Sequence, residues 1–374
     1  MLMNLVSLPA SNALALSIAM ALSGSTAALA TAVAADTVTT AANTLKASTA
    51  RNGLSVDRRY FQVDQPVEVR VPPIKGDNAS LVILTAGNEA VVSEDIAANA
   101  GRVDIASVFP DLFKLDAVHY LQLMVDDEAV HSPLVLQPMV NRPRPIIRME
   151  QRGPGRTPVV SGWDRVPPQQ QAMAGFRIYP ESNVLLKTTQ GEIELAMRPD
   201  HAPNTVWNFI SLVEGGFYTK IPFHRVVSQT RSGFPFVIQA GDPTGTGMGG
   251  PGYQIDLEPS TLPHDLGVIS MAREGTDVDT GGSQFFICLS REGTQFLDGQ
   301  YTAFASTVEG IDVVNAIAAV ETDPRTNRPK DMPYINSASL APAPPRTPID
   351  AAGEASDDEA GGGSVEGANR SRGN

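Results

Sequence analysis

Only one cysteine, Cys288, occurs in this chain of 374 residues, so no intramolecular disulfide can form. Basic residues are also scarce: 28 Lys and Arg stand against 41 Asp and Glu, which gives a formal net charge of −13. No run of basic residues occurs, whereas proteins that bind nucleic acid neutralise phosphates with clustered Lys and Arg. We therefore expect no nucleic-acid partner.

Charge is missing from the first 35 residues, and the first charged residue is Asp36. This stretch is rich in Ala, Leu and Ser and ends in Ala32-Val33-Ala34, a small-x-small pattern typical of signal-peptidase sites. We expect residues 1–35 to be a cleaved signal peptide, so that the mature protein is exported and keeps no stable membrane span. An uncleaved membrane anchor and a disordered alanine-rich leader are the alternatives.

The next segments differ in composition. Residues 54–138 contain alternating runs such as Val67-Glu68-Val69-Arg70-Val71, and this period of two is typical of half-buried strands. We expect a small β-sandwich-like accessory domain here, with a possible protein partner. Residues 36–53 and 139–181, rich in Thr and Ala or in Pro, Gly and Arg, are predicted to be linkers. The acidic tail, residues 337–374, is predicted to be disordered.

Residues 182–336 have the pattern of a compact, mainly β domain. Residues 184–188 and 192–197 alternate in polarity around Gln190-Gly191, which predicts a hairpin. Helical spacing of apolar residues follows Pro203, and again precedes Val320. We expect a closed antiparallel β-barrel capped by two helices.

Five short motifs follow one another in this domain. They are Phe223-His224-Arg225-Val226-Val227, Phe236-Val237-Ile238-Gln239-Ala240-Gly241-Asp242, Ser270-Met271-Ala272, Gly282-Ser283-Gln284-Phe285-Phe286-Ile287 and Phe296-Leu297-Asp298-Gly299. In this order and spacing they resemble the cyclophilins, a family of peptidyl-prolyl cis–trans isomerases. One departure is the segment 228–235, which is longer than the usual short turn of the family.

The resemblance implies a set of site residues. Arg225 and Gln239 correspond to the catalytic positions, with Gln239 holding the guanidinium of Arg225. The substrate-binding positions of the pocket and groove correspond to Phe236, Val237, Ala272, Arg273, Gln284, Phe286, Phe296, Leu297 and Tyr301. At Arg273 the family contact is made by the main chain. Phe296 and Tyr301 stand where the best-known members have Trp and His, a pattern that resembles bacterial cyclophilins and points to a periplasm.

Prolyl isomerisation makes and breaks no covalent bond, so we expect neither a metal nor a cofactor. The barrier is amide resonance, about 18–20 kcal/mol. When the bond is twisted, the proline nitrogen regains its lone pair, and a donor such as Arg225 binds that state more strongly than the planar one. We thus expect a rotamase that acts on unfolded or extended proline-containing polypeptides and assists folding as a chaperone does. The alternative is a non-catalytic proline-peptide-binding or scaffold module of the cell envelope.

Overall fold

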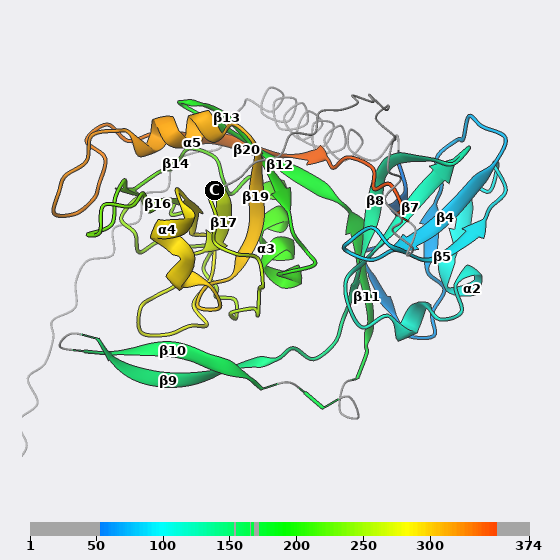
Figure 1. Ribbon diagram of the computed structural model, residues 1–374. Helices are drawn as coiled ribbons and strands as arrows, with labels where there is room; N and C mark the ends of the chain where they lie inside the picture. The colour runs from blue at the N-terminus through cyan, green and yellow to red at the C-terminus, as the bar shows by residue number, and fades with distance from the viewer. Residues whose placement is uncertain (1–52, 153–154, 165, 168–171, 350–374) are drawn as a thin grey trace, which may run out of the picture. The chain divides into compact units, whose positions relative to one another are not determined.

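The computed structural model describes residues 53–152, 155–164, 166–167 and 172–349. These residues form mainly strands with few helices, which confirms the predicted mainly β class (Figure 1). The predicted signal peptide and nearly all of the predicted linker 36–53 lie outside the described residues. Within the described ranges, no helix is long and apolar enough to cross a membrane.

Two antiparallel sheets form the N-terminal region. The first has the order β1–β3–β6, with strands Ser55–Val56, Glu68–Arg70 and Arg102–Asp104. The second has the order β2–β11–β8–β7–β4–β5, with strands Tyr60–Gln62, Gly175–Pro180, Glu128–Pro138, His119–Val125, Ala79–Leu84 and Ala90–Asp95. The short helices α2 (Ile105–Val108) and η1 (Leu112–Lys114) lie between β6 and β7.

Side chains of both sheets share one hydrophobic core. Val69 of the first sheet is fully buried, as are Leu81 and Leu121 of the second, and all belong to one cluster. Alternate residues of a strand point to one face, so the period of two in the sequence becomes this apolar layer.

The segment 139–181 differs from the expected linker because it contains three strands. Strand β11 (Gly175–Pro180) pairs with β8 and β2, so the accessory region extends to residue 180. Strands β9 (Arg144–Arg152) and β10 (Gly155–Asp164) form a separate two-stranded hairpin (Figure 1). Pro145 and Pro158 lie within these strands, and such prolines make a strand hard to recognise in a sequence.

A single sheet of nine strands organises the C-terminal region. Its order is β14–β20–β12–β13–β19–β17–β18–β16–β15. In that order the strands are Ile221–Pro222, Tyr334–Pro342, Ser182–Thr188, Gly191–Met197, Ala303–Glu309, Val268–Met271, Phe285–Cys288, Val237–Ala240 and Arg225–Val227. The predicted closed barrel is not confirmed, because the hydrogen-bonded order ends at β14 and β15 and the sheet is curled but open.

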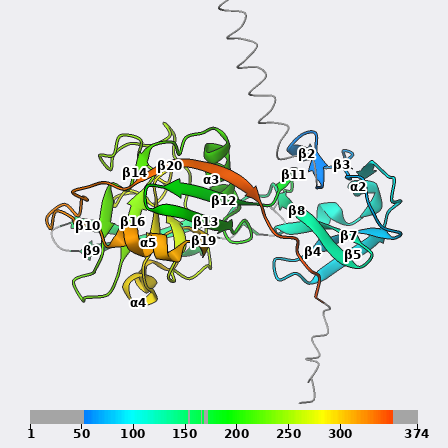
Figure 2. The ribbon, with the colours of Figure 1, turned by 90° about the horizontal axis from the view of Figure 1, so that it is seen from above.

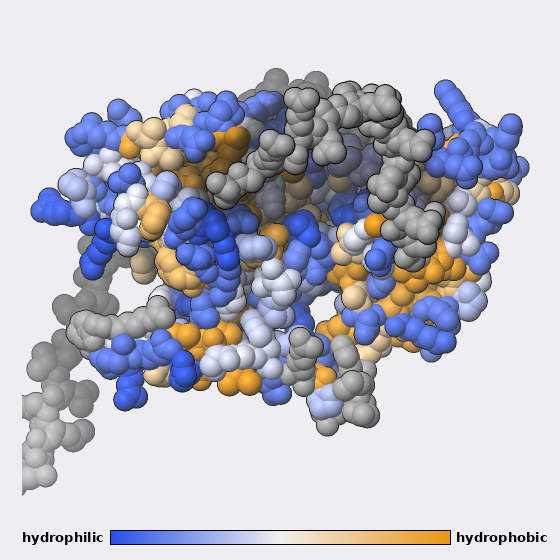
Figure 3. All heavy atoms as spheres, in the orientation of Figure 1, coloured by the Kyte–Doolittle hydropathy of each residue, from blue (hydrophilic) through white to orange (hydrophobic). Residues whose placement is uncertain are grey.

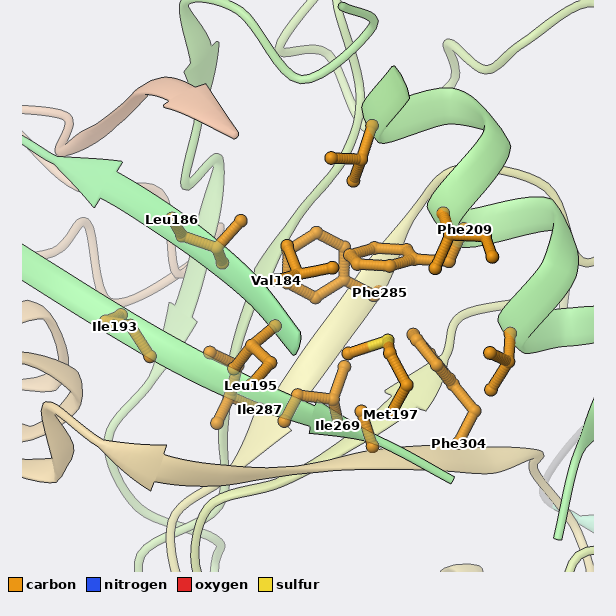
Figure 4. Packing of buried hydrophobic residues seen from close by; sticks show 14 of the residues in the cluster. Val184, Leu186, Ile193, Leu195, Met197, Phe209, Ile269, Phe285, Ile287 and Phe304 are labelled. Carbon is orange, nitrogen blue, oxygen red and sulfur yellow. The ribbon is translucent and has the colours of Figure 1, made fainter. Parts of the chain in front are cut away.

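Both predicted helices are present, as α3 (Pro203–Glu214) and α5 (Ile311–Ala318), and the short α4 (Arg291–Thr294) and η3 (Gln295–Leu297) lie between β18 and β19. Phe209 of α3 is fully buried in the sheet's core. Its ring lies edge-on to Phe285 at 5.4 Å and tilted to Phe304 at 5.1 Å (Figure 4). The helical spacing predicted from the sequence thus becomes one buried face of α3.

The segment after residue 336 is not wholly a tail. Strand β20 runs to Pro342 along β12, although the two are about 150 residues apart in sequence (Figure 2). Beyond it, the guanidinium of Arg346 makes two hydrogen bonds to Glu181, of 2.8 and 2.7 Å. The domain that was expected to end at residue 336 therefore includes β20, and residues 350–374 lie outside the described ranges.

Candidate functional site

Three neighbouring strands bring Arg225, Gln239 and Phe286 into one row. Arg225 of β15 lies opposite Gln239 of β16, and Gln239 lies opposite Phe286 of β18. Opposite residues in antiparallel strands project from the same face, so these three side chains share one face of the sheet. Val226 and Ile238, which point to the other face, are fully buried in the main core, and their burial fixes the register.

A chain of hydrogen bonds orients Arg225. Gln284 donates through its Nε2 to the carbonyl oxygens of Gly247 (3.0 Å) and Gly249 (2.8 Å). Carbonyls only accept, so the Oε1 of Gln284 is turned toward Gln239, whose Nε2 donates to it at 3.0 Å. The Oε1 of Gln239 then accepts from Nη1 of Arg225 at 3.2 Å. The loop carbonyls thereby set the direction of both amides and the position of the guanidinium.

The loop that carries these carbonyls is held by Asp242, whose side chain is buried. Its carboxylate accepts hydrogen bonds from the backbone N–H groups of Thr244 (2.7 Å) and Gly247 (2.6 Å) and from the hydroxyl of Thr244. Burial alone would raise the pKa of Asp242, but these hydrogen bonds outweigh it and lower the pKa to about 2. A Cβ atom at Gly249 would lie 2.0 Å from a carboxylate oxygen of Asp242, so only glycine fits there.

A small hydrophobic cluster, separate from the main core, includes Phe286. Its members are Val237, Phe286, Cys288 and Leu297, with the partly buried Phe236, Ala272 and Tyr301 packed against them. All except Cys288 are predicted pocket or groove residues. The structure therefore brings together side chains from β16, β18 and η3, and from residues next to β16, β17 and β19, that the sequence assigns to one site.

Aromatic contacts line this cluster. The rings of Phe286 and Tyr301 meet edge to face at 5.6 Å, and those of Phe236 and Phe296 stack at 5.8 Å. Phe296 is 60% exposed, so it lies at the rim and not in the interior. The guanidinium of Arg273 lies 4.5 Å from the centre of the Tyr301 ring, so its side chain also takes part in the rim.

Comparison with known proteins shows which family this part of the chain resembles. A family model described as "Cyclophilin type peptidyl-prolyl cis-trans isomerase/CLD" matches residues 183–340. The peptidyl-prolyl cis-trans isomerase of Synechococcus elongatus is 44% identical over 138 residues, which are 36% of this chain and 88% of that protein. The chain belongs to the cyclophilin family. Its cyclophilin domain is a peptidyl-prolyl cis–trans isomerase.

Proteins from eukaryotes are similar as well. "Peptidyl-prolyl cis-trans isomerase-like 1" of Mus musculus is 40% identical over 154 residues, which are 40% of this chain and 86% of that protein. The crystal structure of a Cryptosporidium parvum cyclophilin type isomerase, in the presence of the dipeptide Ala-Pro, is 30% identical. It covers 42% of this chain and 98% of its own, with a TM-score of 0.39.

The guanidinium of Arg225 lies partly buried in the cyclophilin domain. Burial lowers the pKa of Arg225 below its usual value, while the nearby Tyr301 acts in the opposite direction. Arginine nonetheless keeps its proton in proteins, so the group remains a cationic donor.

The lengthened segment 228–235 leaves the site intact. It folds on itself, because the backbone N–H of Thr230 donates to the carbonyl of Phe234 at 2.7 Å. Strand pairing begins with Val227 opposite Val237, which returns Phe236 and Val237 to the hydrophobic cluster. Phe234 is 46% exposed and lies outside that cluster.

The sequence did not predict a buried polar network that lies next to Phe286. His264 is 1% exposed and makes 2.9 Å hydrogen bonds to Asp298 through Nδ1 and to the hydroxyl of Ser270 through Nε2. Its ring is stacked on Phe286 at 6.1 Å. Ser, His and Asp in this order resemble a hydrolytic triad, but Ser270 is fully buried, so the network supports the Phe286 ring and does not meet substrate.

Gln300 is a second residue that the motifs did not indicate. Its side-chain amide makes two hydrogen bonds to the backbone of Val160, in the β9–β10 hairpin: Val160 N–H donates to Oε1 at 2.9 Å, and Nε2 donates to the Val160 carbonyl at 3.0 Å. The two partners are 140 residues apart in the sequence, so no local pattern predicts this contact.

Two side chains of reactive types lie near the site, His224 and Cys288, and both have a structural role. Among the described residues, neither ring nitrogen of the buried His224 has a hydrogen-bond partner, and burial lowers its pKa. Burial raises the pKa of Cys288 to about 12, so its sulfur stays a neutral thiol at physiological pH.

Proposed function

We propose that the cyclophilin domain acts on Xaa–Pro bonds in unfolded or extended segments of other proteins, and that it thereby assists their folding. The catalytic residue is Arg225. Its guanidinium donates a hydrogen bond to the proline nitrogen as the amide twists and the nitrogen regains its lone pair. This donation is stronger in the twisted state than in either planar isomer, and that difference lowers the barrier.

The other site residues position Arg225 and bind the substrate next to it. Gln239 is a positioning residue, because it contacts Arg225 and not the proline. Phe236, Val237, Phe286 and Leu297 form the apolar pocket for the proline ring, with Phe296 and Tyr301 at its rim. Ala272, Arg273 and Gln284 border the groove for the residues that precede proline.

One observation carries this proposal: the 3.2 Å hydrogen bond from Arg225 to Gln239 lies beside an apolar cluster separate from the core. A charged donor at the edge of an apolar surface suits a substrate that presents a neutral ring and a developing lone pair. A module that only binds proline peptides has no need for such an oriented donor.

The test is an exchange assay on a short Xaa–Pro peptide, read by NMR or by coupled proteolysis. We expect Arg225→Ala to lower kcat/KM by about a hundredfold, the effect of removing one charge-assisted donor worth about 3 kcal/mol. Arg231→Ala, in the exposed segment before β16, is the matched control and keeps the wild-type rate. Equal rates for wild type and Arg225→Ala would contradict the proposed role and favour a proline-binding module.

We further propose that this is an exported bacterial protein, periplasmic after removal of a signal peptide. The uncharged first 35 residues and their small-x-small end support export, and the Phe296 and Tyr301 pattern supports a bacterial origin. N-terminal sequencing of the mature protein should begin close to Ala35. An intact Met1 would contradict cleavage.

For the N-terminal region we propose a small β-sandwich that docks a protein partner. Two sheets with one shared core, formed by residues such as Val69 and Leu121, support this interpretation. Binding of a partner would direct the isomerase to particular substrates.

A further inference from the structure

The β9–β10 hairpin is joined to the rim of the substrate groove. Both polar groups of the Val160 backbone are bonded to the side chain of Gln300. The carbonyl of Gln300 accepts a 3.2 Å hydrogen bond from Nε of Arg273, whose guanidinium lies over the next residue, Tyr301. The hairpin thus continues from the end of the groove that borders the residues preceding proline.

One face of this hairpin is apolar. In the strand register Ile147 lies opposite Val160, and Met149 lies opposite Pro158, so these four side chains share a face. Pro158 is buried, whereas Ile147 is 38% and Met149 50% exposed. Figure 3 shows hydrophobic side chains gathered on the surface of the hairpin.

The opposite face has a different character. Arg148 and Glu150 lie on it and form a 2.7 Å ion pair, so these two charges satisfy one another. Ile146 projects from it beside Gly162 and is 50% exposed, the same fraction as Met149. Val159, opposite Arg148, is half-buried on this face too, so this face holds two apolar side chains among charged ones, whereas four apolar side chains share the Ile147–Met149 face.

The hairpin is better suited to binding through this face than through its edges. Pro145 and Pro158 lack N–H groups, which hinders the addition of a further strand to either edge. Its charge also differs from that of the chain as a whole, which is −13. Between residues 144 and 164 the charged residues are Arg144, Arg148, Arg152 and Arg156 against Glu150 and Asp164.

We propose that the Ile147–Met149 face is an extension of the substrate groove, which binds apolar side chains of an extended polypeptide on the amino-terminal side of its proline. The inference rests on the proposed function. It follows from the continuity of hairpin, Gln300, Arg273 and Tyr301, and from an exposed apolar face at the end of that path. In the strand register Arg156 lies opposite Gln151 and shares the Ile147–Met149 face, which favours clients with an acidic residue among the apolar ones.

The experiment compares three peptides with the full chain: a short Xaa–Pro peptide, the same peptide extended at its amino end by leucine-containing sequence, and the same peptide extended equally at its carboxyl end. Extensions of about eight residues span roughly 26 Å. We expect wild type to favour the amino-extended peptide over the short one by about tenfold in kcat/KM, through a lower KM, because apolar surface is buried. The carboxyl extension should give no such gain.

The double variant Ile147→Ser/Met149→Ser should reduce this preference to nearly one. Ile146→Ser is the matched control, equally exposed on the opposite face, and should retain the preference. Gln300→Leu removes both hydrogen bonds between this side chain and the Val160 backbone of the hairpin. It should reduce the preference as the double variant does. Thermal unfolding of each variant verifies that the fold is kept.

Three results would overturn the inference: an equal gain from the carboxyl extension, an equal loss in Ile146→Ser, or a preference that survives the double variant. A concentration-dependent dimer in sedimentation that the double variant abolishes would also overturn it, because the face would then bind a second copy of the chain. If wild type fails to accelerate even the short peptide, the proposed function fails instead. Fluorescence anisotropy with the labelled extended peptide still tests the hairpin in that case.

Discussion

The position of Arg225 depends on amides that are themselves oriented from outside the pocket. Gln284 is fixed by two loop carbonyls, Gln239 by Gln284, and Arg225 by Gln239. A side-chain amide can otherwise rotate and present its N–H₂ to a guanidinium, which would repel it. The network therefore removes an unproductive arrangement before the substrate arrives.

We expect Gln239→Leu to lower kcat by about tenfold while KM changes little. The variant loses the hydrogen bond that orients Arg225, which raises the activation free energy by about 1.4 kcal/mol, and no substrate contact is removed. Separate measurement of kcat and KM on a short Xaa–Pro peptide checks this split. Gln295→Leu, an exposed glutamine of η3, serves as the control. A rise in KM with unchanged kcat would instead mean that Gln239 binds substrate.

Contiguous motifs predicted Arg225, Gln239 and Phe286, because each motif is a short strand with its neighbours. The supporting residues were not predictable in this way. His264 acquires its meaning from Asp298, 34 residues away, and Gln300 from Val160, 140 residues away. Such pairs are created by the packing of distant segments and leave no periodic trace in the sequence.

At the scale of elements, the loop that follows β16 matters for both activity and stability in acid. Its carbonyls orient Gln284, and the carboxylate of Asp242 holds it in place. Asp242 holds this loop and has a pKa of about 2, below the value of about 3.9 for an unfolded chain. A carboxyl group whose pKa is depressed on folding stabilises the protein above the unfolded pKa, and this contribution disappears as the pH falls through the folded pKa.

We therefore expect Asp242 to contribute on the order of 2 kcal/mol near neutral pH, and to lose this contribution between about pH 4 and pH 2. Urea unfolding at a series of pH values should show a large gap between wild type and Asp242→Asn at pH 7 that narrows toward pH 2. Asp312→Asn, on the exposed surface of α5, is the control. A gap that stays constant with pH would show that the carboxylate charge is not what matters.

Strands with clean alternation were predicted, including β12 and β13, and so were helices α3 and α5. The elements that escaped prediction have weak or interrupted patterns. Strand β20 is rich in Ala and Ser, and β9 and β10 contain proline and arginine. Their strand conformation depends on the strands with which they pair. Strand β20 pairs with β12, and β9 and β10 pair with each other.

At the scale of the whole chain, the segment after β20 fastens the C-terminal residues to the N-terminal sheets. Arg346 bonds twice to Glu181, and its guanidinium also bonds to Asn88 at 2.8 Å and lies over the ring of Tyr120. The Arg346 side chain is 18% exposed and that of Glu181 9%, so water screens this ion pair poorly. A second Arg–Glu pair, Arg59 with Glu214, is also joined by two hydrogen bonds, but its side chains are 43% and 37% exposed.

These two pairs form a matched test of how much burial matters. We expect Arg346→Ala to lower the free energy of unfolding by about 3 kcal/mol, because Glu181 is left charged and without its partner in a dry site. Arg59→Ala should lower it by no more than about 1 kcal/mol, since water solvates Glu214 once its partner is gone. Urea unfolding followed by tryptophan fluorescence measures both. Equal losses would mean that the last described residues are held by their backbone bonds and not by the buried ion pair.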